Sequence, residues 1–231
     1  MVLPIATIVS VTSDDTTEID FIIYLRSEHE QYLVDSLFAS AESIGLTVNP
    51  MYLSWDDWLA ADDAGAYDIS YGGIQIAYNI DTIINLVYCT IGLEWMVLKH
   101  SDAKLSKFVN QLFNYYISLQ TTADEDLPDL LADMLNKFND VEERLWEKQL
   151  IIPLAQWLNP YLACNSALFI NSQEGNVFAD EDLRFSLASA IDRSLFVDYW
   201  SAILPFPVYE VYHMYLWSSF HNFNLPNCVP S

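Results

Sequence analysis

The residues that could do chemistry in this chain are acids, histidines and cysteines, and their spacing matches none of the common catalytic motifs. The sequence has no GxSxG nucleophile elbow, no GxxxxGK[ST] phosphate loop, no HExxH pair and no GxGxxG turn. We therefore expect a binding protein that is not an enzyme and that needs no cofactor.

Adjacent acids give little indication of acid–base catalysis. The pairs are Asp14-Asp15, Asp56-Asp57 and Asp62-Asp63. Each pair lies beside residues that favour turns or helix starts, where carboxylates accept backbone N–H hydrogen bonds or stay solvated. We interpret all three pairs as capping or solvated acids.

The histidines and cysteines show no spacing typical of a metal site or a redox pair. His213 and His221 lie in an aromatic tail and do not fit a helical ligand pair. Cys89, Cys164 and Cys228 are far apart and form no CxxC motif. We expect buried free thiols and no bound metal.

The charge balance limits the classes of partner. Nine basic residues against 32 acidic ones give a net charge of -23, which repels phosphate backbones and anionic lipid headgroups. Nucleic acid is therefore not an expected partner. The acidity either attracts cationic ligands or keeps an aromatic-rich surface soluble, and the second interpretation is favoured. No segment has the length and flanks of a membrane span, so no membrane insertion is predicted.

The first part of the chain alternates strand and helix patterns. The amino-terminal run MVLPIATIVSVTSDD has no basic residue before its apolar part, so we interpret it as a strand and not as an export signal. Next come a β-branched strand at 19–25, a helix with a Ser27/Glu30 capping box that ends at Gly45, a strand at 46–53, a short helix capped by Ser54, and a strand that exits at Gly72-Gly73.

The second part is first helical and then returns to strands. We expect mainly helix over 80–150, strands at 151–157 and 166–172, one helix from Asp180 to Trp200, and irregular packing after Leu204. The fold class predicted is α/β, a single domain over 1–231 with a mostly parallel sheet flanked by helices.

A ligand edge is expected where the strands end, because ligands in such sheets bind beyond the carboxyl ends of the strands. The Gly72-Gly73 exit marks this edge, and several aromatic residues near it could form a stacking wall for a ligand or could equally belong to the core. These aromatic residues are Trp55, Trp58, Tyr71 and Tyr78.

Three blocks of sequence resemble the second lobe of the oligopeptide-type (family 5) extracellular solute-binding proteins. The first runs from IDFIIYL through SIGLTVNPMYLSWDDWL to YDISYGG, and is similar to the family's "iGi.v", "dw" and "yDi…gg" segments. The others are EERLWEKQLIIPLAQW and ALFINSQEGNVFADEDLRFSLASAIDRSLFVD, the second similar to the "R.Al..AiDR" signature. This last block precedes the first in the family but follows it here, so the chain resembles one lobe with permuted segment order.

The resemblance implies a periplasmic-binding-protein-like (type II) lobe. The candidate ligand-binding residues follow from the sheet edge and from this resemblance together. Those residues are Gly72, Gly73, Tyr78, Asp81 and Trp55. The acid that holds a peptide's amino group in the family corresponds to Ala77, with Asp81 as the nearest acid, which weakens the case for a free-amine peptide. Arg184, Asp192 and Arg193 match a family helix in which such residues more often make ion pairs inside the lobe than touch ligand.

The function implied is that of a solute-binding lobe of an ABC-transporter receptor. It would bind a peptide-like or other small molecule, with a second lobe or a transporter permease as partner, outside the cytoplasm. One alternative is a cytoplasmic ligand-sensing domain that resembles the sugar-phosphate-stress transcription regulators. Another is an interaction domain that has lost its ligand.

Overall fold

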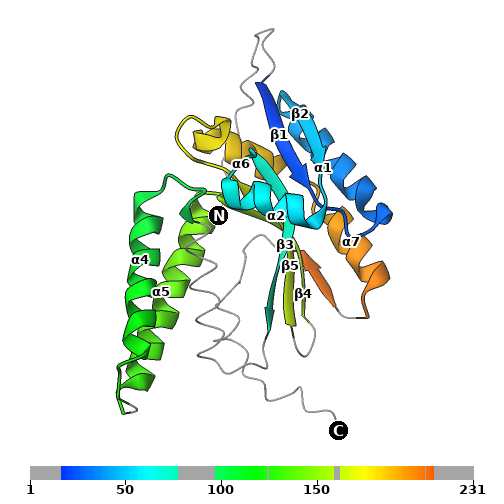
Figure 1. Cartoon of the computed structure of the whole chain (residues 1–231). Coiled ribbons are helices and arrows are strands. Elements are labelled where there is room, and N and C mark those ends of the chain that lie inside the picture. The colour runs from blue at the N-terminus through cyan, green and yellow to red at the C-terminus, as the bar shows by residue number, and fades with distance from the viewer. Residues whose placement is uncertain (1–16, 78–96, 124, 159–161, 206, 211–231) are drawn as a thin grey trace, which may run out of the picture.

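The computed structural model describes residues 17–77, 97–123, 125–158, 162–205 and 207–210, which form an α/β fold (Figure 1). The predicted strand before residue 17, the region 78–96 and the tail after 210 lie outside the described residues. None of the described helices is both long enough and apolar enough to cross a membrane.

The first β-α-β unit forms as its sequence pattern predicts. It consists of β1 (Thr17–Ile23), the short 3-10 helix η1 (Glu28–Glu30), α1 (Gln31–Ser43) and β2 (Leu46–Tyr52). Gly45, at φ +89°, takes the left-handed conformation that ends α1. The expected capping box does not form, because Ser27 makes no side-chain cap bond and its Oγ instead lies 3.3 Å from Tyr199 Oη.

The next elements are α2 (Trp55–Ala64) and β3 (Ile69–Ala77). Ser54 caps α2 as predicted, since its side chain accepts a hydrogen bond from the Asp57 backbone N–H. Two long helices follow, α4 (Ala103–Leu119) and α5 (Leu127–Glu147), which confirms the helical prediction for the described part of 80–150.

The sheet is mixed, so the prediction of a mostly parallel sheet is wrong. It has six strands in the order β2-β1-β3-β5-β4-β6, the last three being β5 (Leu162–Ile170), β4 (Ile151–Leu158) and β6 (Val208–Glu210). β1 is parallel to β2 and β3, whereas β3–β5, β4–β5 and β4–β6 are antiparallel. The β4 and β5 sequences follow each other closely, and a short connection can join only antiparallel neighbours.

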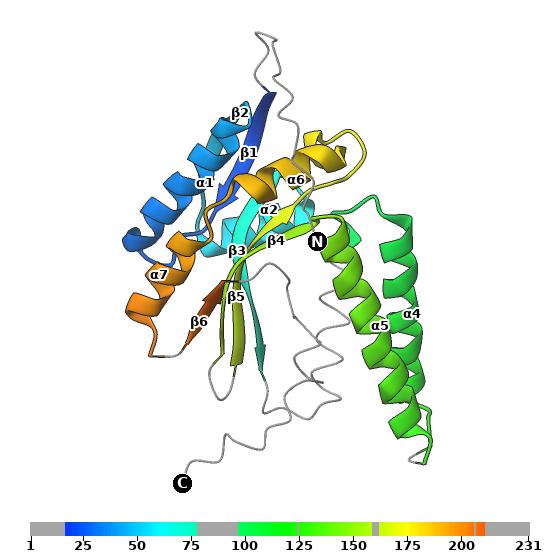
Figure 2. The ribbon, with the colours of Figure 1, turned by 180° about the vertical axis from the view of Figure 1, so that it is seen from behind.

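Helices cover both faces of the sheet (Figures 1 and 2). α1, α6 (Glu181–Ala190) and α7 (Ser194–Ile203) pack on one face through residues such as Leu37, Leu187 and Phe196. α2 packs on the opposite face, where α4 and α5 enclose Ala167 and Phe169 of β5. The two views show the α4–α5 hairpin beside the sheet, running away from α6.

The single helix expected from Asp180 to Trp200 is two helices, α6 and α7. Asp180 is the N-cap as predicted, because its side chain accepts from the Asp182 N–H. The break comes at Ile191, which is extended, and the Asp192 carboxylate then accepts from the Ser194 N–H and hydroxyl. This side chain offers the backbone a turn in place of a continuous helix.

Candidate functional site

The parallel pairing of β1 with β3 ends where β1 ends. The last β1–β3 pair is Ile23 with Tyr71, and β3 then continues against β5, with Gly72 opposite Ala167 and Gly73 opposite Ser166. The predicted strand exit at Gly72-Gly73 is therefore wrong, because antiparallel pairing with β5 extends β3 past both glycines. The two glycines still lie directly beyond the carboxyl end of β1, where ligands bind in α/β sheets.

An aromatic cluster lies at this level, on the α2 face of the sheet. Tyr24 follows β1, and Trp55 and Trp58 lie in the first turns of α2. The rings of Trp55 and Trp58 are stacked, with centroids 5.4 Å apart and planes at 13°, and Tyr24 meets Trp55 edge-on at 5.1 Å. We call these three residues the aromatic edge.

Gly72 allows the aromatic edge to pack closely on the sheet. A Cβ at this position would lie 3.0 Å from Trp58 Cζ2 and 3.3 Å from Phe169 Cε2. A side chain at residue 72 would thus displace the Trp58 ring. Gly72 and Trp55, predicted separately as ligand residues, are brought together through Trp58.

The two tryptophans differ in exposure. Trp55 is 49% exposed, whereas Trp58 is 6% exposed and its indole Nε1 has no hydrogen-bond partner among the described residues. A half-exposed indole backed by a stacked ring presents a rigid apolar surface at low entropic cost. The aromatic edge can therefore bind the flat face of a small solute.

A buried ion pair lies behind the aromatic edge. Asp62 is one helical turn after Trp58 on α2 and is fully buried, and its Oδ2 lies 2.8 Å from Nζ of Lys99, which is 2% exposed. The hydroxyls of Tyr67 and Ser70 also act on this carboxylate. The Lys99 ammonium lies over the Tyr67 ring at 5.4 Å.

Burial shifts both members of the pair toward their neutral forms. It raises the pKa of Asp62, against the opposing effects of Lys99, Tyr67 and Ser70. It also lowers the pKa of Lys99 to about 8, although the Asp62 charge acts in the opposite direction. The interpretation of Asp62 as a solvated or capping acid is therefore wrong, whereas Asp56, Asp57 and Asp63 are exposed as expected.

The residues that flank the Asp62–Lys99 pair connect the end of β5 to neighbouring loops by hydrogen bonds. His100 is buried beside it, with Nδ1 3.2 Å from Ser172 Oγ, and burial together with the charges of Lys99 and Arg184 lowers the His100 pKa to about 3. The Asn171 amide donates to the carbonyl oxygens of Gly65 and Tyr67 at 3.0 and 2.9 Å. The end of β5 thus holds the loop between α2 and β3.

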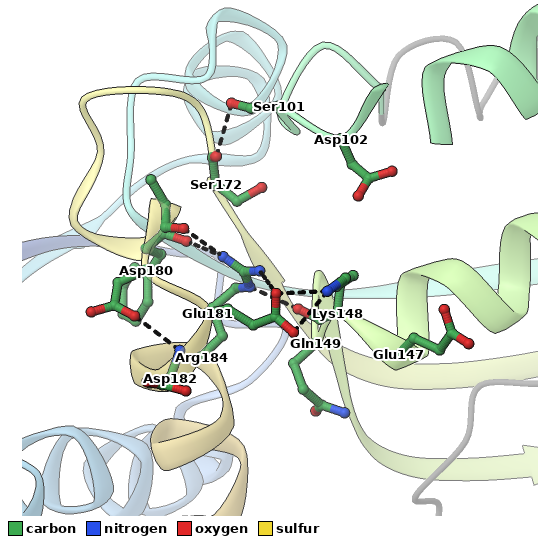
Figure 3. A network of polar contacts seen from close by, with 12 residues as sticks. Ser101, Asp102, Glu147, Lys148, Gln149, Ser172, Asp180, Glu181, Asp182 and Arg184 are labelled. Atoms are coloured by element: carbon green, nitrogen blue, oxygen red, sulfur yellow. Dashed lines mark hydrogen bonds and ion pairs between the residues drawn. The ribbon is translucent and has the colours of Figure 1, made fainter. Parts of the chain in front are cut away.

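The arginines of the family-like helix have internal structural roles. Arg184 donates to the carbonyl oxygens of Lys148 and Phe178 at 2.7 and 2.6 Å, and Lys148 pairs with Glu181 at 2.7 Å (Figure 3). Arg193 donates to the carbonyl oxygens of Pro153 and Ala188. These contacts are made to backbone carbonyl oxygens and fasten α6 and its flanking loops to β4.

The remaining predicted site residues are not all brought to the aromatic edge. Tyr71 is fully buried on the opposite face, where its Oη accepts from Ser166 Oγ at 3.4 Å. Gly73 lies in β3, and Tyr78 and Asp81 lie outside the described residues. Within the part of the chain that the structure describes, no group of His, Cys, Asp and Glu side chains has a metal-binding arrangement.

Sequence reasoning missed Asp62 and Lys99 for a physical reason. Lys99 comes from a distant segment, and no sequence period relates the two residues. One indication was present, since Asp62 follows Trp58 by four residues and must share its buried helix face.

The geometry defines an α/β fold with an aromatic cluster at the end of its parallel strands, and comparisons with known proteins add no relative. No protein family model, no curated protein and no solved structure matches the chain.

Proposed function

We propose that the chain is a solute-binding domain that captures a small molecule at the aromatic edge, as a lobe of an ABC-transporter receptor does. The observation that carries this proposal is the half-exposed Trp55, stacked on the buried Trp58 and positioned at the carboxyl end of β1. The ligand class is a small solute with a flat face, such as a sugar ring or a peptide side chain. Its role is capture without conversion.

A single lobe supplies one wall of a binding cleft, so the proposal includes a second lobe that closes over the ligand. Stacking on one indole contributes about 1 kcal/mol beyond area burial. We therefore expect weak binding by this chain alone and tighter binding when the partner lobe is present.

A thermal-shift screen with peptides, sugars and sugar phosphates tests the proposal. A bound ligand raises the melting temperature in proportion to RT ln(1 + [L]/Kd). Trp55→Ala should abolish the shift, whereas Trp146→Ala, which removes a tryptophan 37% exposed on α5, should leave it unchanged. Absence of a shift with every class, or an equal shift in Trp55→Ala, would count against the proposal and favour an interaction domain.

A further inference from the structure

A second polar cluster lies on the opposite face of the sheet, where the chain passes from β1 into α1. Its central residue is Glu30, which is 1% exposed. The Arg26 guanidinium lies 3.9 Å from it, and Tyr71 and Tyr199 belong to the core cluster on this face of the sheet. Trp200 completes the cluster, with its ring 4.9 Å from that of Tyr199.

The Glu30 carboxylate is buried without full satisfaction. Its Oε1 lies 3.9 Å from Nε of Arg26, and its Oε2 has no hydrogen-bond partner among the described residues. A buried carboxylate oxygen without a donor is destabilising, because the hydrogen bonds it made to water are not replaced. The cluster therefore has unused capacity to accept hydrogen bonds from a cation.

The Arg26–Glu30 contact is loose when compared with another arginine pair in the same molecule. Arg144 Nε lies 3.0 Å from both carboxylate oxygens of Asp102, and its Nη2 lies 2.5 Å from Oδ2. Arg26 makes one long contact and keeps 34% of its side chain exposed. A planar guanidinium that fitted this carboxylate would make two parallel hydrogen bonds.

Aromatic rings provide the second element of a cation site. The Arg26 guanidinium lies over the Trp200 ring, 5.2 Å from its centroid, and that ring also stacks on Trp157 at 4.6 Å. A cation over a tryptophan face is attracted by the ring quadrupole, and the attraction grows as water is excluded. The net charge of -23 also raises the local concentration of cations.

We propose that Glu30 and Trp200 form a binding site for a small organic cation of the guanidinium class, and that Arg26 occupies this site when no ligand is bound. The exposed Arg26 side chain swings out, and the ligand takes its place with hydrogen bonds to both Glu30 oxygens. This site lies on the face opposite the aromatic edge and is independent of the solute bound there.

Titration calorimetry at low ionic strength tests the proposal with methylguanidinium as the probe and methylurea as its neutral isostere. Wild-type protein should bind methylguanidinium weakly but saturably, because Arg26 competes. Arg26→Ala should bind it at least about tenfold more tightly, equal to about 1.4 kcal/mol. Glu30→Gln, which keeps the shape and removes the charge, should bind neither compound.

Three outcomes would overturn the proposal. The first is that wild-type protein binds methylurea as tightly as methylguanidinium, and the second is that Glu30→Gln still binds methylguanidinium. The third is that wild-type protein binds no methylguanidinium, even if Arg26→Ala does. If Arg26→Ala does not fold, the comparison of wild-type protein with Glu30→Gln still tests the proposal. Wild-type protein must bind methylguanidinium saturably, and Glu30→Gln must not bind it.

Discussion

Asp62 and Glu30 are almost fully buried carboxylates on opposite faces of one sheet, and they differ in how close their cation lies. The Lys99 ammonium lies 2.8 Å from Asp62 Oδ2. The Arg26 guanidinium lies 3.9 Å from Glu30 Oε1, and the Arg26 backbone also acts on this carboxylate. Burial raises the pKa of both carboxyls, and for Glu30 only Arg26 acts against it.

The difference teaches that burial alone does not define the role of a carboxylate. A buried carboxylate in direct contact with its cation joins two segments, as Asp62 joins α2 to the segment of Lys99. A buried carboxylate whose cation is more distant and partly exposed is the better candidate for a ligand site.

The largest expected loss of stability comes from removal of the Lys99 ammonium beside Asp62. Lys99→Met keeps the aliphatic stem but leaves Asp62 buried without its cation, which should lower the free energy of unfolding by about 3–5 kcal/mol. Arg26→Met should cost about 1 kcal/mol or less, because its contact is long and partly exposed. Denaturant unfolding measures both losses. Similar losses for the two variants would contradict the difference drawn between Asp62 and Glu30.

Acid should destabilise the same region through His100. Its folded-state pKa of about 3 lies below the usual 6.5, so the unfolded chain binds an extra proton between these values. The contribution is complete above pH 6.5 and is lost as the pH falls toward 3, by about 4–5 kcal/mol, since each pKa unit corresponds to about 1.4 kcal/mol. His100→Gln should flatten this part of the stability curve. His29→Gln, at an exposed site, should leave it unchanged, and identical curves for wild type and His100→Gln would contradict the assignment.

A side chain at residue 72 should disturb the aromatic edge and leave the Glu30 face intact. Gly72→Val should cost about 1–3 kcal/mol, because its Cβ would lie 3.0 Å from Trp58. Addition of Trp58→Leu should recover part of this loss, since the smaller side chain frees space. Thermal unfolding of the single and double variants checks this, and a strictly additive loss would contradict the proposed contact.

The cap of α2 should have the smallest effect. Ser54→Ala removes the acceptor for the Asp57 N–H and should cost about 1 kcal/mol, whereas Ser54→Asp should retain most of the stability. Denaturant unfolding of the two variants measures the difference. Equal stability of Ser54→Ala and wild type would show that the cap contributes nothing.

Local rules predicted much of the fold. The β-branched run of β1, the apolar stripe of α1, the Ser54 and Asp180 caps and Gly45 all act within a few residues, so their patterns are visible in the sequence. The direction of the β3–β5 pairing joins distant segments and was therefore not predicted. The break between α6 and α7 was missed because an apolar stripe continues through Ile191.

Less of the candidate site could be predicted. The rule that ligands bind at the ends of parallel strands led to Trp55 and Gly72 as candidates, and the structure places them together through Trp58, with Gly72 inside β3. The burial of Asp62 and Glu30 depends on which face each acid turns to and on partners from other elements. The sequence pattern indicated a solvated or capping acid at Asp62 and a capping box at Glu30.

In the proposed function a solute binds against the Trp55 ring. Covalent labelling of tryptophan with mass-spectrometric detection tests this contact most directly. Without ligand, Trp55 at 49% exposure and Trp146 at 37% should both be modified readily. With a ligand from the screen at saturation, modification of Trp55 should fall several-fold while that of Trp146 stays constant. Unchanged modification of Trp55 by a saturating ligand would contradict the account.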